Sequence, residues 1–180
     1  MAKFFNRLDP NLREFIGAQH LFFVASAPRE GRVNLSPKGM DTLRILDDHR
    51  LAYLDLTGSG NETAAHVLEN GRLTLMCCSF DAQPLILRAY GHGEIVLPHS
   101  PAWQSLAPLF PDIPGARQII VMHIDSVQTS CGFAIPFYTF VAHRHVLAEW
   151  ATNKGVTGLT HYWQEKNTRS IDGLPTPFTV

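Results

Sequence analysis

The sequence predicts a mainly β protein, in which an antiparallel barrel or sandwich carries short flanking helices. Most of its β-rich segments are joined by short turns, which favours antiparallel pairing. Two predicted strands, residues 85–96 and 117–132, are long. Glycine interrupts the first of them at positions 91 and 93, where a bulge or bend helps a barrel to close. We expect a single domain over residues 1–180.

The first helix is expected at residues 9–19. Asp9 can cap it, a proline suits its first turn, and apolar side chains follow at helical spacing. Residues 20–28 and 32–37 come next as two β-rich segments. The Pro-Arg-Glu-Gly sequence between them ends in Gly31, which can adopt the positive φ of a tight turn. These two segments therefore predict a β-hairpin.

The rest of the chain alternates strands with short helices. Asn70 and Gly71 mark the end of one helix, and Ser100 with a following proline marks the start of another. The C-terminal third changes character and is expected to be helical from about residue 137. In order, the expected elements are a connector at 38–50, a strand at 51–57, a helix at 62–70, strands at 72–80 and 85–96, a helix at 98–110, a strand at 117–132, a helix at 137–150, a loop at 153–158, a helix at 159–167 and an extended, proline-containing tail at 168–180.

Composition and charge exclude several classes of partner. The formal net charge is −1 and the pI is near 6.7, so no long-range field attracts nucleic acid, and we expect no nucleic-acid partner. No apolar run approaches the roughly 18 residues of a membrane helix, and the opening MAKFFNRLDP lacks the apolar core of a signal peptide. The cysteines include an adjacent pair and no CxxC spacing, which favours a reducing cytoplasm.

The sequence GSGNET at residues 58–63 lies where a strand ends and a helix begins. The free N–H groups and positive dipole end of that helix favour an anion, and Ser59, Asn61 and Thr63 could complete a phosphate cradle. Ordinary capping explains the same residues, because Ser59 or Asn61 would cap the helix and the glycines would make the turn. Both interpretations stay open on this segment alone.

Named motifs for phosphate, metal and nucleophile sites are incomplete. No lysine follows either glycine of GSGNET, as a nucleoside-triphosphate loop requires. The dinucleotide fingerprint GxGxxG is nearly met, with Thr63 in place of the third glycine, but no second βα unit follows it. Neither HExxH nor GxSxG occurs, so we expect no metal site and disfavour a hydrolase.

Two further candidates carry a cation. Residues 34–39, NLSPKG, end a strand with a hydroxyl, a proline-fixed turn and Lys38, which could meet an anionic ligand or an electron-rich ring. The alternative is a β-turn with a solvated lysine. Arg88 lies within the apolar segment LILRAY, where a guanidinium needs a partner if it points inward and costs little if it faces solvent. The residues alone leave both alternatives open.

Six segments together resemble the FMN-binding split-barrel flavoproteins related to pyridoxamine 5′-phosphate oxidase: SPKG, YLDLTGSGNETAAHV, CSFD, GHGE, SCG and NTRSIDGLPT. The resemblance spans almost the whole chain and keeps the order of the elements. It implies a six-stranded antiparallel split barrel, which forms a homodimer with FMN in a cleft between the two subunits. FMN would then carry out redox chemistry on a small-molecule substrate.

The resemblance also implies which residues bind FMN. The strand end and helix start would contact the phosphate, Lys38 would be the main polar contact from the second strand, and Arg88 would reach phosphate or ring. Trp163 and residues 167–175 would approach the flavin from the partner subunit. The implied cofactor-binding residues are Ser36, Pro37, Lys38, Gly39, Thr57, Gly58, Ser59, Asn61, Thr63, Arg88, Trp163 and Ser170.

The chain departs from true pyridoxamine 5′-phosphate oxidases at two points. Their helix start carries a basic pair where this chain has Asn61, Glu62 and Thr63. Their C-terminal region carries basic residues that bind the substrate's own phosphate, and the final SIDGLPTPFTV has none. Phosphate would therefore be held more by the helix dipole and neutral donors than by charge, and vitamin B6 is not the expected substrate.

Two functions follow from the resemblance. The first is an FMN-dependent oxidoreductase, in which a hydride or electron pair moves between substrate and flavin, and oxygen or a nicotinamide completes the cycle. No side chain is assigned as acid or base. The second is a non-catalytic module that holds flavin or haem on the same barrel, with His66, His92 and His123 as candidate iron ligands.

Overall fold

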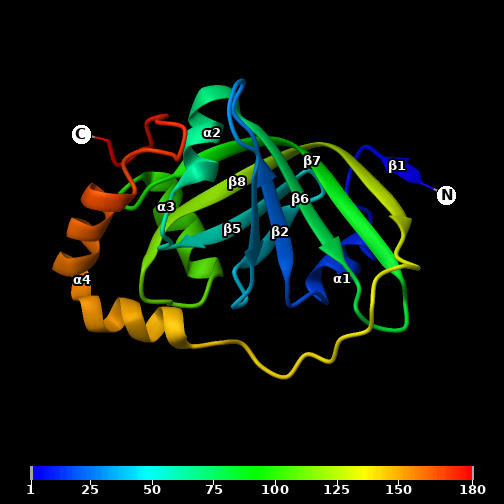
Figure 1. Cartoon of the computed structure of the whole chain (residues 1–180). Coiled ribbons are helices and arrows are strands. Elements are labelled where there is room, and N and C mark those ends of the chain that lie inside the picture. The colour runs from blue at the N-terminus through cyan, green and yellow to red at the C-terminus, as the bar shows by residue number, and fades with distance from the viewer. Residues whose placement is uncertain (1, 180) are drawn as a thin grey trace.

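The structure, a computed structural model, describes residues 2–179 and arranges them around one antiparallel sheet of 8 strands. The strand order is β3-β2-β6-β7-β8-β5-β4, and β1 pairs with β8. The sheet curls, so that β5 and β8 pass behind β2 and β6, and α4 lies outside it (Figure 1). The elements are β1 (Lys3–Phe5), α1 (Pro10–Gly17), β2 (Phe22–Ser26), β3 (Asn34–Lys38), β4 (Leu43–Asp47), β5 (Arg50–Leu56), α2 (Glu62–Asn70), β6 (Arg72–Cys78), β7 (Leu85–Val96), α3 (Pro101–Leu106), η1 (Ala107–Leu109), β8 (Ala116–Cys131) and α4 (Val146–Lys166).

The long pairing of β7 with β8 contains the predicted bulge. The register shifts between Tyr90 and Gly91, which bends both strands. Gly91 is required there by close approach of the backbones, because a Cβ at this position would lie 1.9 Å from the carbonyl oxygen of His123. A Cβ at Gly93 would lie 2.6 Å from the side chain of Val67 on α2. The two glycines thus bend the sheet and let α2 pack closely against it.

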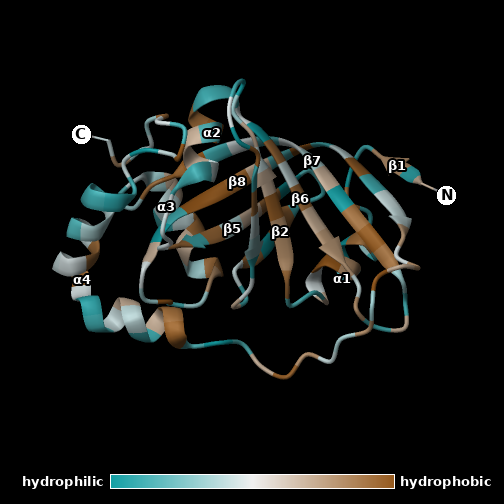
Figure 2. Cartoon of the chain, viewed as in Figure 1, coloured by the Kyte–Doolittle hydropathy of each residue, from teal (hydrophilic) through white to brown (hydrophobic). Residues whose placement is uncertain are grey.

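The inner face of the curled sheet forms the core. Val24, Tyr53, Leu87, Ile120 and Met122 come from four different strands and are each at most 1% exposed. Buried and more exposed residues alternate along β2, whereas β5 and the first half of β8 are buried on both faces, and Figure 2 shows these strands as largely hydrophobic. Burial of this face provides the main driving force for folding. The polar residues at the ends of the strands lie outside this core and are available to form a site.

Two strands were not expected from the sequence. Residues 38–50, predicted as a connector, contain β4, which pairs with β5. Residues Lys3–Phe5 form β1 on the side of β8. The prediction of six strands is therefore wrong in number. Every residue of β4 is half-buried, so the strand lacks the alternation of buried and exposed positions that identifies a strand in sequence.

The C-terminal third also differs from the prediction. Residues 133–145, which we call the arm, form no regular helix, and α4 begins at Val146 rather than near residue 137. The arm is held instead by contacts to the barrel: the N–H of Tyr138 donates to the Phe80 carbonyl at 3.1 Å, and Phe140 stacks on His20 at 3.8 Å. The loop expected at 153–158 is reduced to a kink at Gly155, whose φ is 64°.

None of the helices formed by residues 2–179 combines the length and apolar character that crossing a membrane requires.

Candidate functional site

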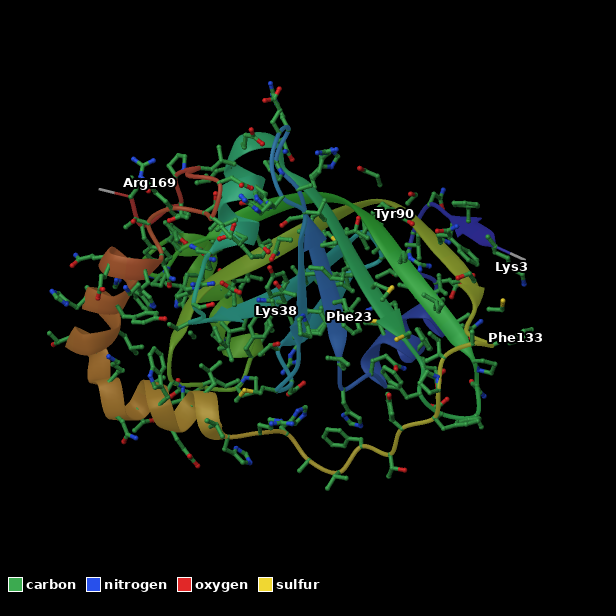
Figure 3. All side chains as sticks on the ribbon, viewed as in Figure 1. Lys3, Phe23, Lys38, Tyr90, Phe133 and Arg169 are labelled. Atoms are coloured by element: carbon green, nitrogen blue, oxygen red, sulfur yellow. The ribbon has the colours of Figure 1, made fainter. Side chains whose placement is uncertain are left out.

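A cavity of about 680 Å³ opens beside the start of α2. Its walls come from β3, the end of β5, the turn before α2, the start of β8 and the segment after α4. Lys38 projects near the middle of the molecule, and Arg169 lies on the C-terminal segment beside α2 (Figure 3). The volume is in the range of small-molecule sites. The lining residues are Arg32, Val33, Asn34, Ser36, Lys38, Asp55, Leu56, Gly58, Ser59, Gly60, Asn61, Glu62, Thr63, Arg117, Lys166, Arg169, Ser170 and Ile171.

The start of α2 differs from the starts of α1 and α3. Asp9 accepts a hydrogen bond from the N–H of Leu12 at 2.9 Å, and Ser100 accepts one from Trp103 at 3.1 Å, so both of those helices have a side-chain cap. Asn61, at the corresponding position of α2, makes no capping bond within residues 2–179. The alternative in which Asn61 caps the helix is therefore excluded, and the first-turn N–H groups of α2 keep their capacity to bind an anion.

Asn61 turns toward β8 instead. Its Oδ1 accepts a hydrogen bond from Gln118 Nε2 at 2.8 Å. The residue is 2% exposed and lines the cavity. Its Nδ2 finds no hydrogen-bond partner in the part of the chain that the structure describes. A buried amide donor without an acceptor is costly, so this atom is suited to receive an acceptor from a ligand.

Asp55 is the centre of a buried ion network at the floor of the cavity. Its oxygens accept hydrogen bonds from Lys38 Nζ at 2.9 Å, from Arg117 Nε at 2.8 Å and from Gln118 Nε2 at 2.8 Å. Burial raises the pKa of Asp55, but the two cations outweigh burial and hold the pKa well below its ordinary value. The carboxylate is therefore ionised, and two cations around one carboxylate leave a net positive charge beneath the cavity.

Arg117 connects the floor to the C-terminal segment. Its Nη1 donates to the Gly60 carbonyl at 2.9 Å and to Asn167 Oδ1 at 2.7 Å. Asn167 is fully buried, and its Nδ2 donates to the Gly58 carbonyl at 3.2 Å. These bonds occupy two carbonyl oxygens of the turn before α2 and hold its backbone in place.

Trp163 and Ser170 reach this region within their own chain. Trp163 Nε1 donates to Thr57 Oγ1 at 2.8 Å, and Thr57 Oγ1 donates to the Gly115 carbonyl at 2.7 Å. Ser170 lines the cavity. In this single chain Trp163 and Ser170 thus reach the cavity without a partner subunit, and their approach to a partner's flavin stays a prediction. The physical reason is that α4 runs along the outside of the barrel and brings its end back to α2, as Figure 1 shows.

Tyr53 adds a further polar atom below the floor. Within residues 2–179, neither its hydroxyl nor Gln118 Oε1 has a hydrogen-bond partner. Burial, with a smaller contribution from the charge of Asp55, raises the pKa of Tyr53 well above its ordinary value, so the phenol is neutral. Lys38 Nζ lies 5.4 Å from the centre of the Tyr53 ring, which adds a cation–π contact to its ion pair with Asp55.

Most of the residues predicted to bind the cofactor meet at this cavity. Thr57 and Trp163 lie directly behind its wall, whereas Pro37 and Gly39 flank the lining residues of β3 without lining the cavity themselves. The predicted residues that line it are Ser36, Lys38, Gly58, Ser59, Asn61, Thr63 and Ser170.

Arg88 is the predicted site residue that lies elsewhere. Its neighbours on β7, Leu87 and Ala89, are both fully buried in the core, so the side chain of Arg88 projects from the outer face of the sheet. There its Nη1 donates to Ser130 Oγ at 3.4 Å. The structure therefore does not bring Arg88 to the cavity of its own chain.

Three functional residues were missed in the sequence, namely Asp55, Arg117 and Gln118, and Asn167 was predicted only as part of the segment 167–175. A signal existed for the first three. Asp55 follows the apolar residues LAYL, and Arg117 and Gln118 precede IIVM, so each places a polar group at the end of a buried strand. The two strands pair so that Asp55 lies opposite Gln118. No local pattern marks Asn167.

The histidines are separate from this cavity. His66 is fully buried on α2, with Nδ1 2.9 Å from Ser26 Oγ. His92 and His123 are about half exposed on β7 and β8, next to Asp125 and Glu94. Over residues 2–179, no three His, Cys, Asp or Glu side chains come together as a metal site requires.

The sequence of the barrel matches a known family. A family model described as pyridoxamine 5′-phosphate oxidase matches residues 8–131, most of the chain. The chain belongs to this family. Within the pyridoxamine 5′-phosphate oxidase family it is 37% identical over 195 residues to the family protein ustO of Aspergillus flavus, in an alignment that covers 97% of this chain and 78% of the relative. The expected family is thereby confirmed.

Solved structures show the same fold. HupZ of group A Streptococcus has a TM-score of 0.52 at 20% identity, over 66% of this chain and 90% of that chain. The FAD binding protein of Mycobacterium smegmatis has a TM-score of 0.51 at 9% identity, over 70% of this chain and 97% of that chain. At these identities the likeness concerns the fold alone. The expected class, a mainly β split barrel with flanking helices, is confirmed, with eight strands in place of six.

Proposed function

We propose that this chain is an FMN-binding flavoprotein that acts as an FMN-dependent oxidoreductase on a small-molecule substrate. The observation that carries the proposal is the start of α2, which has no side-chain cap within residues 2–179 and opens into the cavity. Ser59, Thr63 and Asn61 Nδ2 surround it with hydroxyl and amide donors. A phosphate monoester accepts hydrogen bonds from free backbone N–H groups and from side-chain donors of this kind.

The charge of the lining supports an anionic ligand. Cations outnumber carboxylates among the residues that line the cavity, and part of that excess lies at the buried floor, where it is weakly screened. The carboxylates are Asp55 and Glu62, and the cations are Arg32, Lys38, Arg117, Lys166 and Arg169. A dianionic phosphate therefore fits this cavity better than a neutral ligand does.

FMN, when bound, would supply two-electron redox chemistry. The protein's own groups set the position and charge of the ligand. Lys38 and Arg117 flank Asp55, so the floor favours a ligand that gains negative charge. Tyr53, neutral and buried, adds a cation–π contact to Lys38, whose Nζ lies 5.4 Å from the centre of the ring. The relative from Mycobacterium smegmatis is described as an FAD binding protein, which supports a flavin as the ligand class.

A homodimer is part of the proposal, with a second copy closing the site. The arm exposes Phe133, Phe137 and Val141 at 82%, 78% and 89% of their surface. Several large exposed apolar side chains on one segment mark an interaction surface. Arg88 lies on the outer face of the sheet, half-buried, with a hydroxyl as its hydrogen-bond partner. A second copy that covers the arm and this outer face would bring Arg88 toward its partner's ligand.

The cofactor is tested by titrating purified protein with FMN, FAD and riboflavin. We expect FMN to bind tightest, because riboflavin lacks the phosphate that α2 would hold. Replacing Ser59 and Thr63 together with alanine should weaken FMN about tenfold or more and leave riboflavin unchanged. The matched control is Ser105→Ala with Thr160→Ala, which removes two hydroxyls that bond only to carbonyls in their own helices. Equal binding of FMN and riboflavin would contradict the phosphate assignment.

Turnover separates an enzyme from a carrier. The FMN-loaded protein should oxidise NADH or NADPH in the presence of oxygen or another acceptor, followed by absorbance at the nicotinamide band. A protein that binds FMN but gives no turnover with any reductant is a flavin carrier. A Soret band in the purified protein, in place of flavin absorption, would identify haem as the ligand and overturn the proposal.

The second copy is tested by sedimentation. Replacing Phe137 and Val141 with aspartate should convert a dimer into a monomer and weaken FMN binding in parallel, since the second copy would no longer close the site. Val156→Asp is the matched control, because Val156 is also an exposed apolar residue, at 84%, but lies on α4 away from the arm. A wild-type protein that sediments as a monomer would exclude the dimer.

A further inference from the structure

The segment after α4, residues 167–176, folds across the start of α2 and along the mouth of the cavity. Figure 1 shows it passing beside α2 on its way to the C-terminus, and Figure 3 shows Arg169 on it. Its first residue, Asn167, is fully buried, while Ile171 is 68% exposed. Ser170 and Ile171 line the cavity from this segment. Something must therefore hold an exposed stretch of chain in a position that shapes the cavity.

Glu62 provides one fastening. Both oxygens of its carboxylate lie 3.0 Å from the backbone nitrogen of Ile171, which donates to them. Glu62 is the first residue of α2, so its charge is favourable to the helix dipole. The same charge opposes an anionic ligand at that helix start. A carboxylate in the wall of an anion site is unfavourable for binding. The hydrogen bond from Ile171 gives Glu62 a structural role that explains its presence there.

Arg32, just before β3, provides a second fastening. Its backbone N–H donates to Asp172 Oδ2 at 2.7 Å, and its guanidinium bonds to Asp172 Oδ1. The turn before β3 approaches so closely that a Cβ on Gly31 would lie 2.6 Å from Asp172 Oδ2. Gly31 also has a φ of 129°, which other residues rarely adopt. The turn is thus shaped to receive the carboxylate.

The segment between these fastenings is a closed loop. The N–H of Ser170 donates to the Leu174 carbonyl at 2.9 Å, and Arg169 pairs with Pro175 in an isolated bridge. Arg169 Nη1 donates to the Gly173 carbonyl at 2.9 Å. Because the loop holds its own shape, fastening Ile171 and Asp172 fixes Arg169 and Ser170 as well.

We propose that Glu62 is a positioning residue, which holds the C-terminal segment over the mouth of the cavity and thereby slows release of the anionic ligand. This inference rests on the proposed function, since the ligand is taken to be FMN. The effect that it predicts for loss of the Glu62 side chain on ligand binding is opposite to the effect expected from charge alone. Removing a carboxylate from a phosphate site should tighten binding, whereas removing the acceptor that fastens the segment should loosen it.

Two substitutions separate these effects, because both remove the charge and only one removes the acceptor. In Glu62→Gln the amide oxygen can still accept from Ile171, whereas Glu62→Ala has no acceptor. We expect Glu62→Ala to release FMN about tenfold faster than Glu62→Gln in stopped-flow dissociation, which is the effect of about one hydrogen bond. Glu149→Ala is the matched control, because it removes an acid from the first turn of α4 and should leave release unchanged. Equal release from Glu62→Ala and Glu62→Gln would overturn the proposal.

Amide hydrogen exchange gives a readout that does not depend on the cofactor. The Ile171 N–H should exchange at least about tenfold faster in Glu62→Ala than in the wild type and Glu62→Gln, with circular dichroism unchanged. Exchange at Ile171 that is the same in all three proteins would overturn the fastening whatever the ligand is. If the wild type binds no flavin while Ile171 exchange still separates the two variants, the fastening stands and FMN is the wrong ligand.

Discussion

The floor and the mouth of the cavity each contain a carboxylate paired with cations, but the two pairs differ in burial. At the floor, the side chain of Asp55 is 3% exposed and contacts Lys38 and Arg117. At the mouth, the side chain of Asp172 is 15% exposed, and its partner Arg32 is 67% exposed. Breaking the floor pair would leave buried cations without a counter-charge, whereas the mouth pair can separate into water.

Because they differ in burial, the two ion pairs are expected to affect different properties of the protein, namely its stability and its ligand exchange. A buried charge whose partner is removed is strongly destabilising, while an exposed ion pair contributes little to folding. We therefore expect the floor network to stabilise the barrel and to set the charge beneath the ligand. We expect the mouth contacts to affect binding and release of the ligand. Four measurements test this division.

The largest effect is expected for Asp55→Ala. The substitution leaves Lys38 and Arg117 buried without a carboxylate and should lower the free energy of unfolding by about 3–5 kcal/mol. The measurement is urea unfolding followed by circular dichroism. Asp47→Ala is the control, because it breaks an ion pair of the same kind with Arg50 on the exposed edge of the sheet. Similar losses from the two substitutions would show that burial does not distinguish the pairs.

The pH dependence of stability should follow from the same carboxylate. The folded pKa of Asp55 lies below the unfolded value of about 3.9, so its contribution is complete above that pH and is lost as the pH falls through the folded pKa. Unfolding free energies of the wild type should therefore fall more steeply below about pH 4 than those of Asp55→Asn. Urea unfolding at a series of acidic pH values measures this, and parallel curves would exclude the contribution of Asp55.

A smaller effect is expected for Trp163→Phe, between floor and mouth. The substitution removes the indole donor to Thr57 but keeps an aromatic ring near Phe178, whose ring lies 5.4 Å away. The free energy of unfolding should fall by about 1 kcal/mol, the value of one hydrogen bond. Trp150→Phe is the control, because Trp150 packs against Tyr162 away from the cavity. A loss no greater than that of the control would mean that the Thr57 contact is unimportant.

The smallest effect on folding is expected for Asp172→Ala. The backbone N–H of Arg32 lowers the pKa of Asp172, but the pair is exposed, so the urea midpoint should not change measurably. The N–H of Arg32 should instead exchange faster, because it loses its acceptor. A large shift of the urea midpoint would show that the ion pair at the mouth contributes to folding stability as the floor network does.

How far the fold could be read from sequence depended on whether its signal was local. The bulge at Gly91 and the hairpin of β2 with β3 were predicted, because glycine positions and β-rich segments mark them within a short window. Residues 137–145 of the arm were predicted to be helical, as part of the segment 137–150. The contacts of Tyr138 with Phe80 and of Phe140 with His20 decided otherwise.

By itself the sequence determined the family, the split-barrel class and the turn before α2, since each depends on residue types in order along the chain. Only the tertiary structure decided what the turn is connected to. Arg117 meets Asp55 across 62 residues of sequence and Asn167 across 50, and β8 must pair with β5 and α4 must return to α2 before these contacts exist. The sequence can mark each polar residue at the end of a buried strand, but which of these residues pair is decided by their neighbours in space.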